Sequence, residues 1–201
     1  MEENVKPPVS CPNPVIGEGA MLGAVADSQS VTHDWDSLQE LIAGVQTKEV
    51  KNVVKENGYL TEIWREDWPL EEARVGQVFQ VLITPGGISA WHVHREATDR
   101  LFVNHGLLKI VLYDARPESA TKGRINVFRC GSVRPMLIVV PAGVWHGVQN
   151  ISAAPALLLN LPDRPYRYAA PDHWRLPSNT DRIPYSFTGN VQRTGDESER
   201  I

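Results

Sequence analysis

The chain has 201 residues, of which 42% are hydrophobic and 22% charged, and its formal net charge is −4. These values favour one globular domain that buries a core without disulfides or a structural metal. The acidic balance and the lack of a long basic run argue against a nucleic-acid partner. No apolar run approaches the roughly 20 residues that span a bilayer, and the first residues lack a signal-peptide pattern. We therefore expect a cytoplasmic protein without a membrane partner.

The N-terminal region differs in composition from the rest of the chain. Residues 1–35 are rich in Pro, Gly and Ser and show no sustained period, which predicts an N-terminal arm. Ser37 and Glu40 fit a capping box ahead of LQELIAGV, and this predicts a short helix over about 37–44. Residues 36–187 form the predicted main domain, and the polar residues 188–201 are predicted to be a disordered tail.

From about residue 48 onward, short β-type runs replace any helical pattern. They include YLTEIWRE, QVFQVLITP, LLKIVLYDA and LIVVP, and turn sequences such as Asn57-Gly58 and Pro85-Gly86-Gly87 separate them. Many short strands at a spacing of 8–12 residues are typical of a β-sandwich or a β-barrel. The fold class predicted from this pattern is all-β.

Two histidine-containing segments carry the strongest signal. Residues 86–106 read GGISAWHVHREATDRLFVNHG, and residues 141–150 read PAGVWHGVQN. Within ISAWHVH the alternation of a strand places His92 and His94 on the same face. The two segments resemble the first and second cupin motifs, with Asp99 at the position where Glu is usual and His146 as the last histidine. This resemblance implies a double-stranded β-helix, or jelly-roll barrel, with these side chains in its mouth.

The same four side chains form a candidate metal-ligand set. Three imidazoles and one carboxylate, from His92, His94, Asp99 and His146, suit Fe, Mn, Ni or Zn and leave positions open for substrate. A polar pocket that binds no metal uses the same residues equally well. The sequence therefore leaves a single divalent metal or no cofactor as open alternatives.

A second resemblance covers about residues 48–187. Segments GYLTEIWREDW at 58–68, WHVH at 91–94, GLLKIVLYDAR at 106–116, PAGVWHGV at 141–148 and IPYSF at 183–187 resemble the dTDP-4-dehydrorhamnose 3,5-epimerase family. The resemblance implies a homodimer that binds a nucleotide sugar and works without a metal. In that family a His held by an Asp removes a proton next to a ketone, a Lys stabilises the enolate, and a Tyr returns the proton. The reaction needs a base, a cation near the oxyanion and an acid on the opposite face.

Carrying these roles over places the base on His92, with His146 as the second candidate. The position of the lysine falls on Asp99, and Arg100 is the nearest cation. A carboxylate in place of that lysine repels a developing oxyanion unless a cation lies between the two.

The remaining roles fall on less typical residues. The position of the tyrosine acid falls on Asn160, whereas Tyr166 matches a second tyrosine of the family. The aspartate that holds the base is expected near 179–180, where Asp181 is the closest carboxylate. Candidate substrate-binding residues are Glu62, Arg65, Arg100, Trp145 and Asn160.

The sequence supports three hypotheses. The first is a sugar-nucleotide epimerase or isomerase that acts on a dTDP-4-keto-6-deoxyhexose through His-mediated proton abstraction. The second is a metal-dependent cupin, either a dioxygenase or a Lewis-acid isomerase. The third is a non-catalytic sugar-binding cupin that keeps the pocket and has lost the reaction.

Overall fold

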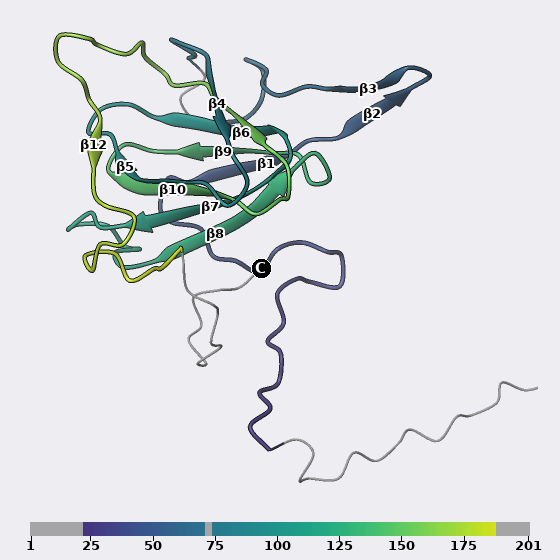
Figure 1. Cartoon of the computed structure of the whole chain (residues 1–201), viewed down its shortest axis with the longest axis horizontal. Helices are drawn as coiled ribbons and strands as arrows, with labels where there is room; N and C mark the ends of the chain where they lie inside the picture. The colour runs from purple at the N-terminus through teal and green to yellow at the C-terminus, as the bar shows by residue number, and fades with distance from the viewer. Residues whose placement is uncertain (1–21, 71–73, 188–201) are drawn as a thin grey trace, which may run out of the picture.

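The computed structural model describes residues 22–70 and 74–187, and in these residues the fold is built from strands (Figure 1). One five-stranded antiparallel sheet has the order β1 (Gln46–Glu49), β9 (Met136–Val140), β6 (Asp99–His105), β11 (Ala156–Asn160), β4 (Phe79–Ile83). The second has the order β12 (Trp174–Arg175), β5 (Ile88–Val93), β10 (Val144–Asn150), β7 (Leu107–Asp114), β8 (Ile125–Gly131). The all-β fold class expected from the sequence is confirmed.

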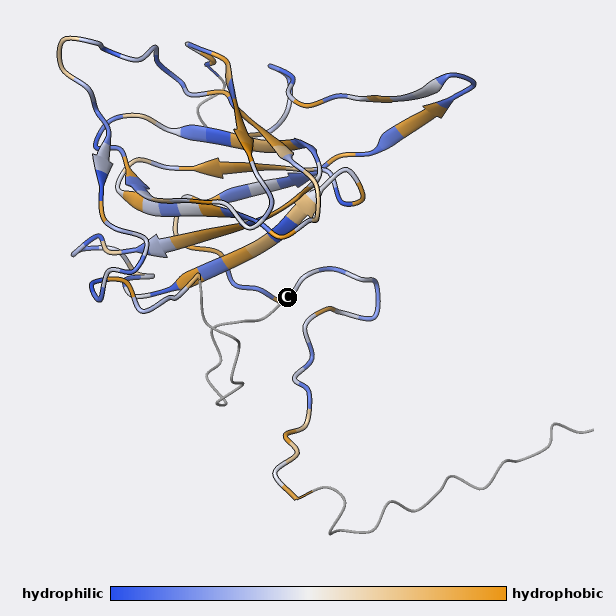
Figure 2. Ribbon diagram, viewed as in Figure 1, coloured by the Kyte–Doolittle hydropathy of each residue, from blue (hydrophilic) through white to orange (hydrophobic). Residues whose placement is uncertain are grey.

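Strand alternation explains the core. Along β7, Leu108, Ile110 and Leu112 are fully buried between the sheets, where they meet residues of β6 and β9 such as Leu101 and Ile138. Figure 2 shows hydrophobic residues concentrated on the strands of the two sheets. Because sheets that pack face to face bury their inner faces together, this pattern holds the two layers in place.

A second apolar cluster covers the outer face of the second sheet. Trp91 of β5 is fully buried there and packs against Tyr185 and Phe187, with ring centroids 6.2 and 5.1 Å away. Since adjacent residues of a strand point to opposite faces, burying Trp91 on this side directs His92 toward the space between the sheets. The C-terminal residues thus help to orient the histidine strand.

The predicted helix over 37–44 is wrong. Ser37 forms an isolated bridge with Val31, and the following residues run extended to a turn. Tertiary hydrogen bonds replace those of a helix: the Asn126 side chain accepts from Ile42 N and donates to Glu40 O, and the Gln39 side chain accepts from Val127 N. Packing against β8 therefore overrides the local capping signal.

A β-hairpin of β2 (Asn52–Lys55) and β3 (Gly58–Thr61) projects from the two sheets (Figure 1). Its turn is Glu56-Asn57, one residue before the Asn57-Gly58 turn that the sequence predicts, and Gly58, which begins β3, has a φ of 142° that favours glycine. Val54 and Tyr59 pair across the hairpin and are 82% and 56% exposed. This protruding element presents apolar side chains to solvent.

The predicted division into an arm at 1–35, a domain at 36–187 and a tail at 188–201 stays a prediction. Residues 1–21 and the whole tail lie outside the described residues. Among residues 22–70 and 74–187, no helix has the length and apolarity that crossing a membrane requires.

Candidate active site

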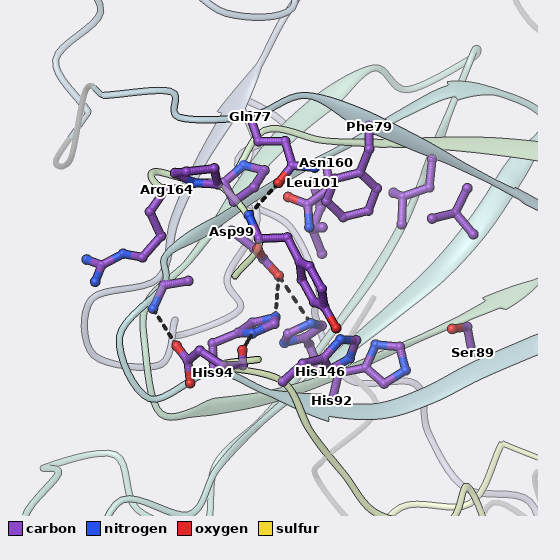
Figure 3. Close-up of a pocket in the computed structure, with 18 of the residues that line it drawn as sticks. Gln77, Phe79, Ser89, His92, His94, Asp99, Leu101, His146, Asn160 and Arg164 are labelled. Atoms are coloured by element: carbon purple, nitrogen blue, oxygen red, sulfur yellow. Dashed lines mark hydrogen bonds and ion pairs between the residues drawn. The ribbon is translucent and has the colours of Figure 1, made fainter. Parts of the chain in front are cut away.

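A pocket of about 300 Å³ lies between the two sheets (Figure 3). Its floor and walls come from β4, β5, β6, β10 and β11, and a C-terminal segment closes one side. The side chains that define its chemistry are His92, His94, Asp99, His146, Asn160, Tyr166, His173 and Arg175. The two cupin-like segments of the sequence therefore meet in one cavity.

Strand register explains why the histidines meet. His92 of β5 lies directly opposite His146 of β10, and their ring centroids are 5.8 Å apart. Directly opposed residues of an antiparallel pair project to the same face. His94 follows β5 on the side of His92, and its ring centroid is 5.5 Å from that of His146.

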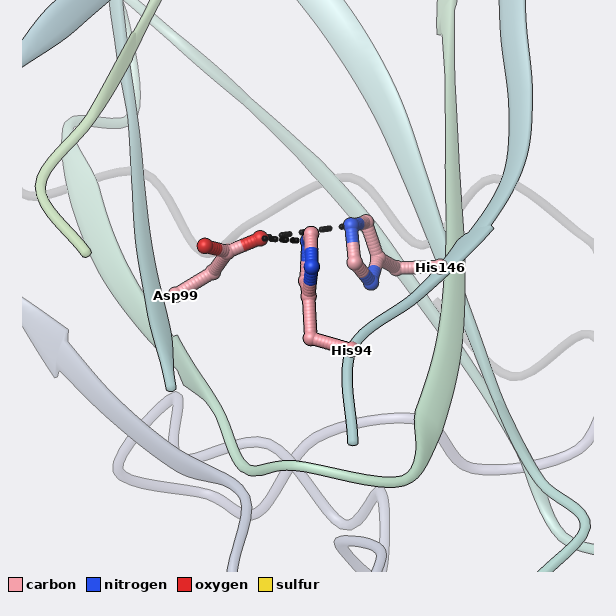
Figure 4. A group of neighbouring side chains, drawn as sticks. All are labelled: His94, Asp99 and His146. Atoms are coloured by element: carbon pink, nitrogen blue, oxygen red, sulfur yellow. Dashed lines mark ion pairs between the residues drawn. The ribbon is translucent and has the colours of Figure 1, made fainter. Parts of the chain in front are cut away.

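Asp99 joins two of these histidines (Figure 4). Its Oδ2 atom lies 3.2 Å from Nε2 of His94 and 3.3 Å from Nε2 of His146. The carboxylate is 3% exposed, so it is separated from bulk water. Ligand atoms of these three residues lie within 4.8 Å of one another, and His92 is outside this group.

Backbone carbonyls hold the other ring nitrogens. Nδ1 of His94 contacts the carbonyl oxygen of Asp172, and Nδ1 of His146 lies 3.3 Å from that of Val144. A carbonyl oxygen only accepts, so Nδ1 of His94 carries a proton in this contact. Both rings are thus oriented with Nε2 toward Asp99.

Burial and neighbouring charges shift the pKa values of the pocket imidazoles in different directions. Burial, the neighbouring His146 and His173, and the cation of Arg175 lower the pKa of His92 to about 3. Burial also lowers the pKa of His94, but the hydrogen bond and charge of Asp99 outweigh it and raise that pKa above its usual value. His92 is therefore a neutral imidazole at neutral pH, and His94 is the more basic of the two.

The C-terminal strap, residues 161–176, covers one side of the pocket. The carboxylate of Asp172 accepts hydrogen bonds from the backbone N–H groups of Arg95, Glu96 and Ala97 at 2.8, 2.8 and 3.1 Å. These hydrogen bonds hold the next residue, His173, against His92 and His94, with ring centroids 4.8 and 5.2 Å away. His173 adds a fourth imidazole to the pocket.

Several residues selected from the sequence line this pocket. They are His92, His94, Asp99, His146, Asn160 and Tyr166. Asn160 is buried at the end of β11, and its side-chain hydrogen bond helps to lower the pKa of Asp99, against the effect of burial. Tyr166 is 45% exposed, and its backbone N–H donates to the Gln77 side chain at 2.7 Å.

Other selected residues lie outside the pocket lining. Arg100 is fully buried and donates to the carbonyl oxygen of Leu161 at 3.1 Å, since it projects from β6 on the face opposite to Asp99. Trp145 packs with the apolar cluster outside the second sheet. Glu62 and Arg65 form an ion pair at 3.0 Å after β3. Asp181 is exposed and does not line the pocket.

Sequence reasoning selected Tyr166 of the strap but missed three other pocket residues of this segment. Asp172, His173 and Arg175 show no recognisable motif, and their role depends on the pairing of β12 with β5, about 80 residues earlier. The only local signal is a histidine beside an aspartate after Pro171.

The comparison with known proteins agrees with this geometry. Residues 45–162, which carry both histidine segments, match the cupin family. The chain is a cupin. The match covers more than half of the chain, and it includes His92, His94, Asp99 and His146 but not the strap residues beyond 162.

Relatives of this cupin carry names from sugar metabolism. A probable low-salt glycan biosynthesis epimerase, Agl13 of Haloferax volcanii, is 32% identical over 137 residues, which are 68% of this chain and 88% of the relative. A dTDP sugar isomerase of Desulfovibrio desulfuricans has a solved structure that is similar with a TM-score of 0.69 and 30% identity. That alignment covers 74% of this chain and 93% of the isomerase.

The fold likeness extends to a dTDP-4-dehydrorhamnose 3,5-epimerase from Elizabethkingia anophelis. Its TM-score is 0.65 at 17% identity, and the alignment covers 77% of this cupin and 86% of the epimerase. At this identity the likeness concerns the fold alone. The resemblance to the dTDP-sugar epimerases that the sequence predicts is confirmed at that level.

Proposed function

We propose that this cupin is a sugar-nucleotide epimerase or isomerase that acts on a dTDP-4-keto-6-deoxyhexose. His92 removes the proton from the carbon next to the ketone. The observation that carries the proposal is the state of His92: it lines the pocket, it is neutral, and its buried Nε2 has no hydrogen-bond partner among the described residues. The names of the relatives support the same class of substrate.

His92 is better suited to act as the base than His146. Nε2 of His146 faces Asp99 and its Nδ1 faces a carbonyl oxygen, so both ring nitrogens are engaged. We further propose that the diphosphate of the bound substrate adds negative charge near the imidazoles. This charge raises the pKa of His92 from about 3 toward the range in which general bases work at neutral pH.

The acid of the proposed reaction is Tyr166. Its side chain lines the same pocket from the strap, whereas His92 comes from β5 of the second sheet. A phenol is a suitable donor to an enediolate because it is neutral at neutral pH. Asn160, at the other candidate position, has no ionisable proton and instead hydrogen-bonds within the site.

Product analysis tests the proposal. Incubation of the protein with a dTDP-4-keto-6-deoxyhexose is expected to give an epimer or a keto isomer, identified by the proton couplings of its sugar ring in NMR spectra. A dTDP-linked sugar without the keto group is the matched control and should stay unchanged, because its ring protons are not acidic. Binding of the keto sugar without any new product would contradict an enzymatic role and favour a non-catalytic sugar-binding cupin.

A metal-dependent reaction is a second candidate, favoured by the group of His94, Asp99 and His146. Ligands that share an ion at bond lengths of about 2.1 Å lie roughly 3.0–3.4 Å apart. Oδ2 of Asp99 lies 3.2 and 3.3 Å from the two Nε2 atoms, so the donor set fits a divalent transition metal. Such an ion would polarise a substrate carbonyl. Metal content of protein purified without added metal, compared with a His94→Ala variant, tests this candidate.

We also propose that this cupin is a homodimer. The projecting hairpin exposes Val54 and Tyr59 on one face, and the edge strand β4 exposes Leu82 (60%). Exposed apolar side chains on protruding or edge strands are typical of surfaces that another chain covers.

A Val54→Glu variant tests the dimer because it places a charge on that hairpin face. The variant is expected to elute as a monomer in size-exclusion chromatography with light scattering, whereas the unaltered protein elutes as a dimer. Val133→Glu is the matched control, since Val133 is 88% exposed at the turn between β8 and β9. A monomeric mass for the unaltered protein would contradict the proposal.

A further inference from the structure

The proposed reaction needs a positive charge that the sequence-based candidates do not supply. Removal of a proton next to a ketone leaves negative charge on the keto oxygen. Arg100, the cation expected from the sequence, is buried outside the pocket lining, and Asp99 occupies the position of the family lysine. The arginines that line the pocket all belong to the strap.

Strand pairing places Arg175 next to His92. β12 pairs with β5 so that Arg175 lies directly opposite His92, and β10 pairs with β5 so that His146 lies opposite His92 on the other side. Directly opposed residues share a face, and neighbouring strands are about 4.8 Å apart. Arg175, His92 and His146 thus form a row across three strands, and all three line the pocket.

Arg175 is also the available cation of the strap. Arg164 pairs with Asp163 at 3.0 Å, and both Arg164 and Arg167 pair with Glu96 at 3.2 Å. Among residues 22–70 and 74–187, Arg175 has no side-chain hydrogen bond or ion pair, and it is exposed and lines the pocket. Its charge already acts on the site, since it contributes to the lowered pKa values of His92 and His173 after burial and the neighbouring imidazoles.

We propose that Arg175 is a catalytic residue that donates hydrogen bonds to the keto oxygen of the substrate while this oxygen becomes negative. The inference rests on the proposed function. The C–H bond next to the ketone breaks, its proton forms an N–H bond with His92, and the electron pair becomes a C=C bond. The former carbonyl pair then resides on the oxygen that faces Arg175. The reverse electron movement, with a proton taken from the acid, forms the new C–H bond.

The arrangement also explains why Asp99 is tolerated. Its carboxylate faces two imidazoles, one of which has a raised pKa, so its charge is compensated within the site. A guanidinium keeps its charge at every working pH and presents several N–H donors in one plane. It therefore suits an oxygen whose charge grows during the reaction.

Arg175→Gln is the variant that tests this role, because it keeps a polar side chain and removes the charge. We expect kcat for deuterium exchange next to the ketone to fall about 100-fold, with KM changed by no more than about threefold. Arg175→Lys should restore most of the loss by returning a cation. Arg182→Gln is the control, since Arg182 is exposed and outside the pocket lining. The Tm of each variant shows whether the fold is kept.

The outcomes distinguish a failure of the role given to Arg175 from a failure of the proposed function. If the unaltered protein catalyses exchange and Arg175→Gln exchanges at the same rate, the role of Arg175 is overturned and the proposed function stays intact. A raised KM with an unchanged kcat also overturns it, because Arg175 would then act on a part of the substrate that does not react. No exchange by the unaltered protein overturns the proposed function itself, and with it the role of Arg175.

Discussion

Replacing His92 with asparagine is expected to lower kcat for the exchange of the substrate proton about 1,000-fold. Asparagine fits the space of the imidazole but accepts no proton at neutral pH. His92 lines the pocket, and the Nε2 atom that the substitution removes is buried and has no hydrogen-bond partner among the described residues. The rate is measured by NMR in D2O at saturating substrate, so that weaker binding does not enter the comparison.

The control for His92→Asn is His105→Asn. His105 ends β6, is exposed and does not line the pocket, so this variant should exchange at the unaltered rate. If His92→Asn keeps more than about a tenth of kcat, another group removes the proton and the assignment of His92 is wrong.

Replacing Asp99 with asparagine is expected to lower kcat about 30-fold through the two histidines that it holds. The neutral amide removes the charge that Nε2 of His94 and Nε2 of His146 face at 3.2 and 3.3 Å. The pKa of His94 then falls, because the hydrogen bond and charge of Asp99 are what outweigh the effect of burial. Steady-state rates with the dTDP-linked keto sugar measure the loss, and titration of the His94 ring by NMR measures the pKa.

The metal content of the same variant separates the two candidate functions. Under the epimerase proposal, Asp99→Asn changes the rate and the titration of His94, and neither protein needs metal for exchange. Under the metal-dependent alternative, the variant loses a ligand, so metal binding and activity fall together and added metal restores part of both. An unchanged rate in Asp99→Asn would contradict the role given to Asp99 in either case.

The core of the site could be predicted from the sequence because its determinants are local. The two-residue spacing of His92 and His94 places both on one face of a strand, whatever the rest of the fold does. Asp99 and His146 lie in motifs whose turns, His105-Gly106 and Pro141-Ala142-Gly143, delimit neighbouring strands. The all-β architecture followed from the spacing of such runs.

The strap could not be predicted because its position is set by contacts distant in sequence. The three hydrogen bonds of Asp172 join residues 75–77 positions apart, and β12 is only two residues long. A strand of two residues has no periodicity in the sequence. The positions of His173 and Arg175 in the pocket therefore could not be predicted from a pattern.

The wrong helix and the position of Arg100 outside the pocket lining have a related cause, because local sequence does not show tertiary contacts. Hydrogen bonds with β8, such as those of Asn126, outweigh the helix-capping signal of Ser37 and Glu40. Arg100 is next to Asp99 in sequence, but alternation sends neighbouring side chains of a strand to opposite faces of the sheet. Proximity along the chain was therefore a poor guide to the cation of the site.

The most direct measurement is the deuterium content of a dTDP-4-keto-6-deoxyhexose recovered after incubation in D2O with protein that has been treated with a chelator. The proposed function predicts deuterium on a carbon next to the ketone, at a rate that His92→Asn lowers about 1,000-fold and the chelator does not change. Recovery of the sugar without deuterium, although calorimetry shows that it binds, would contradict the account.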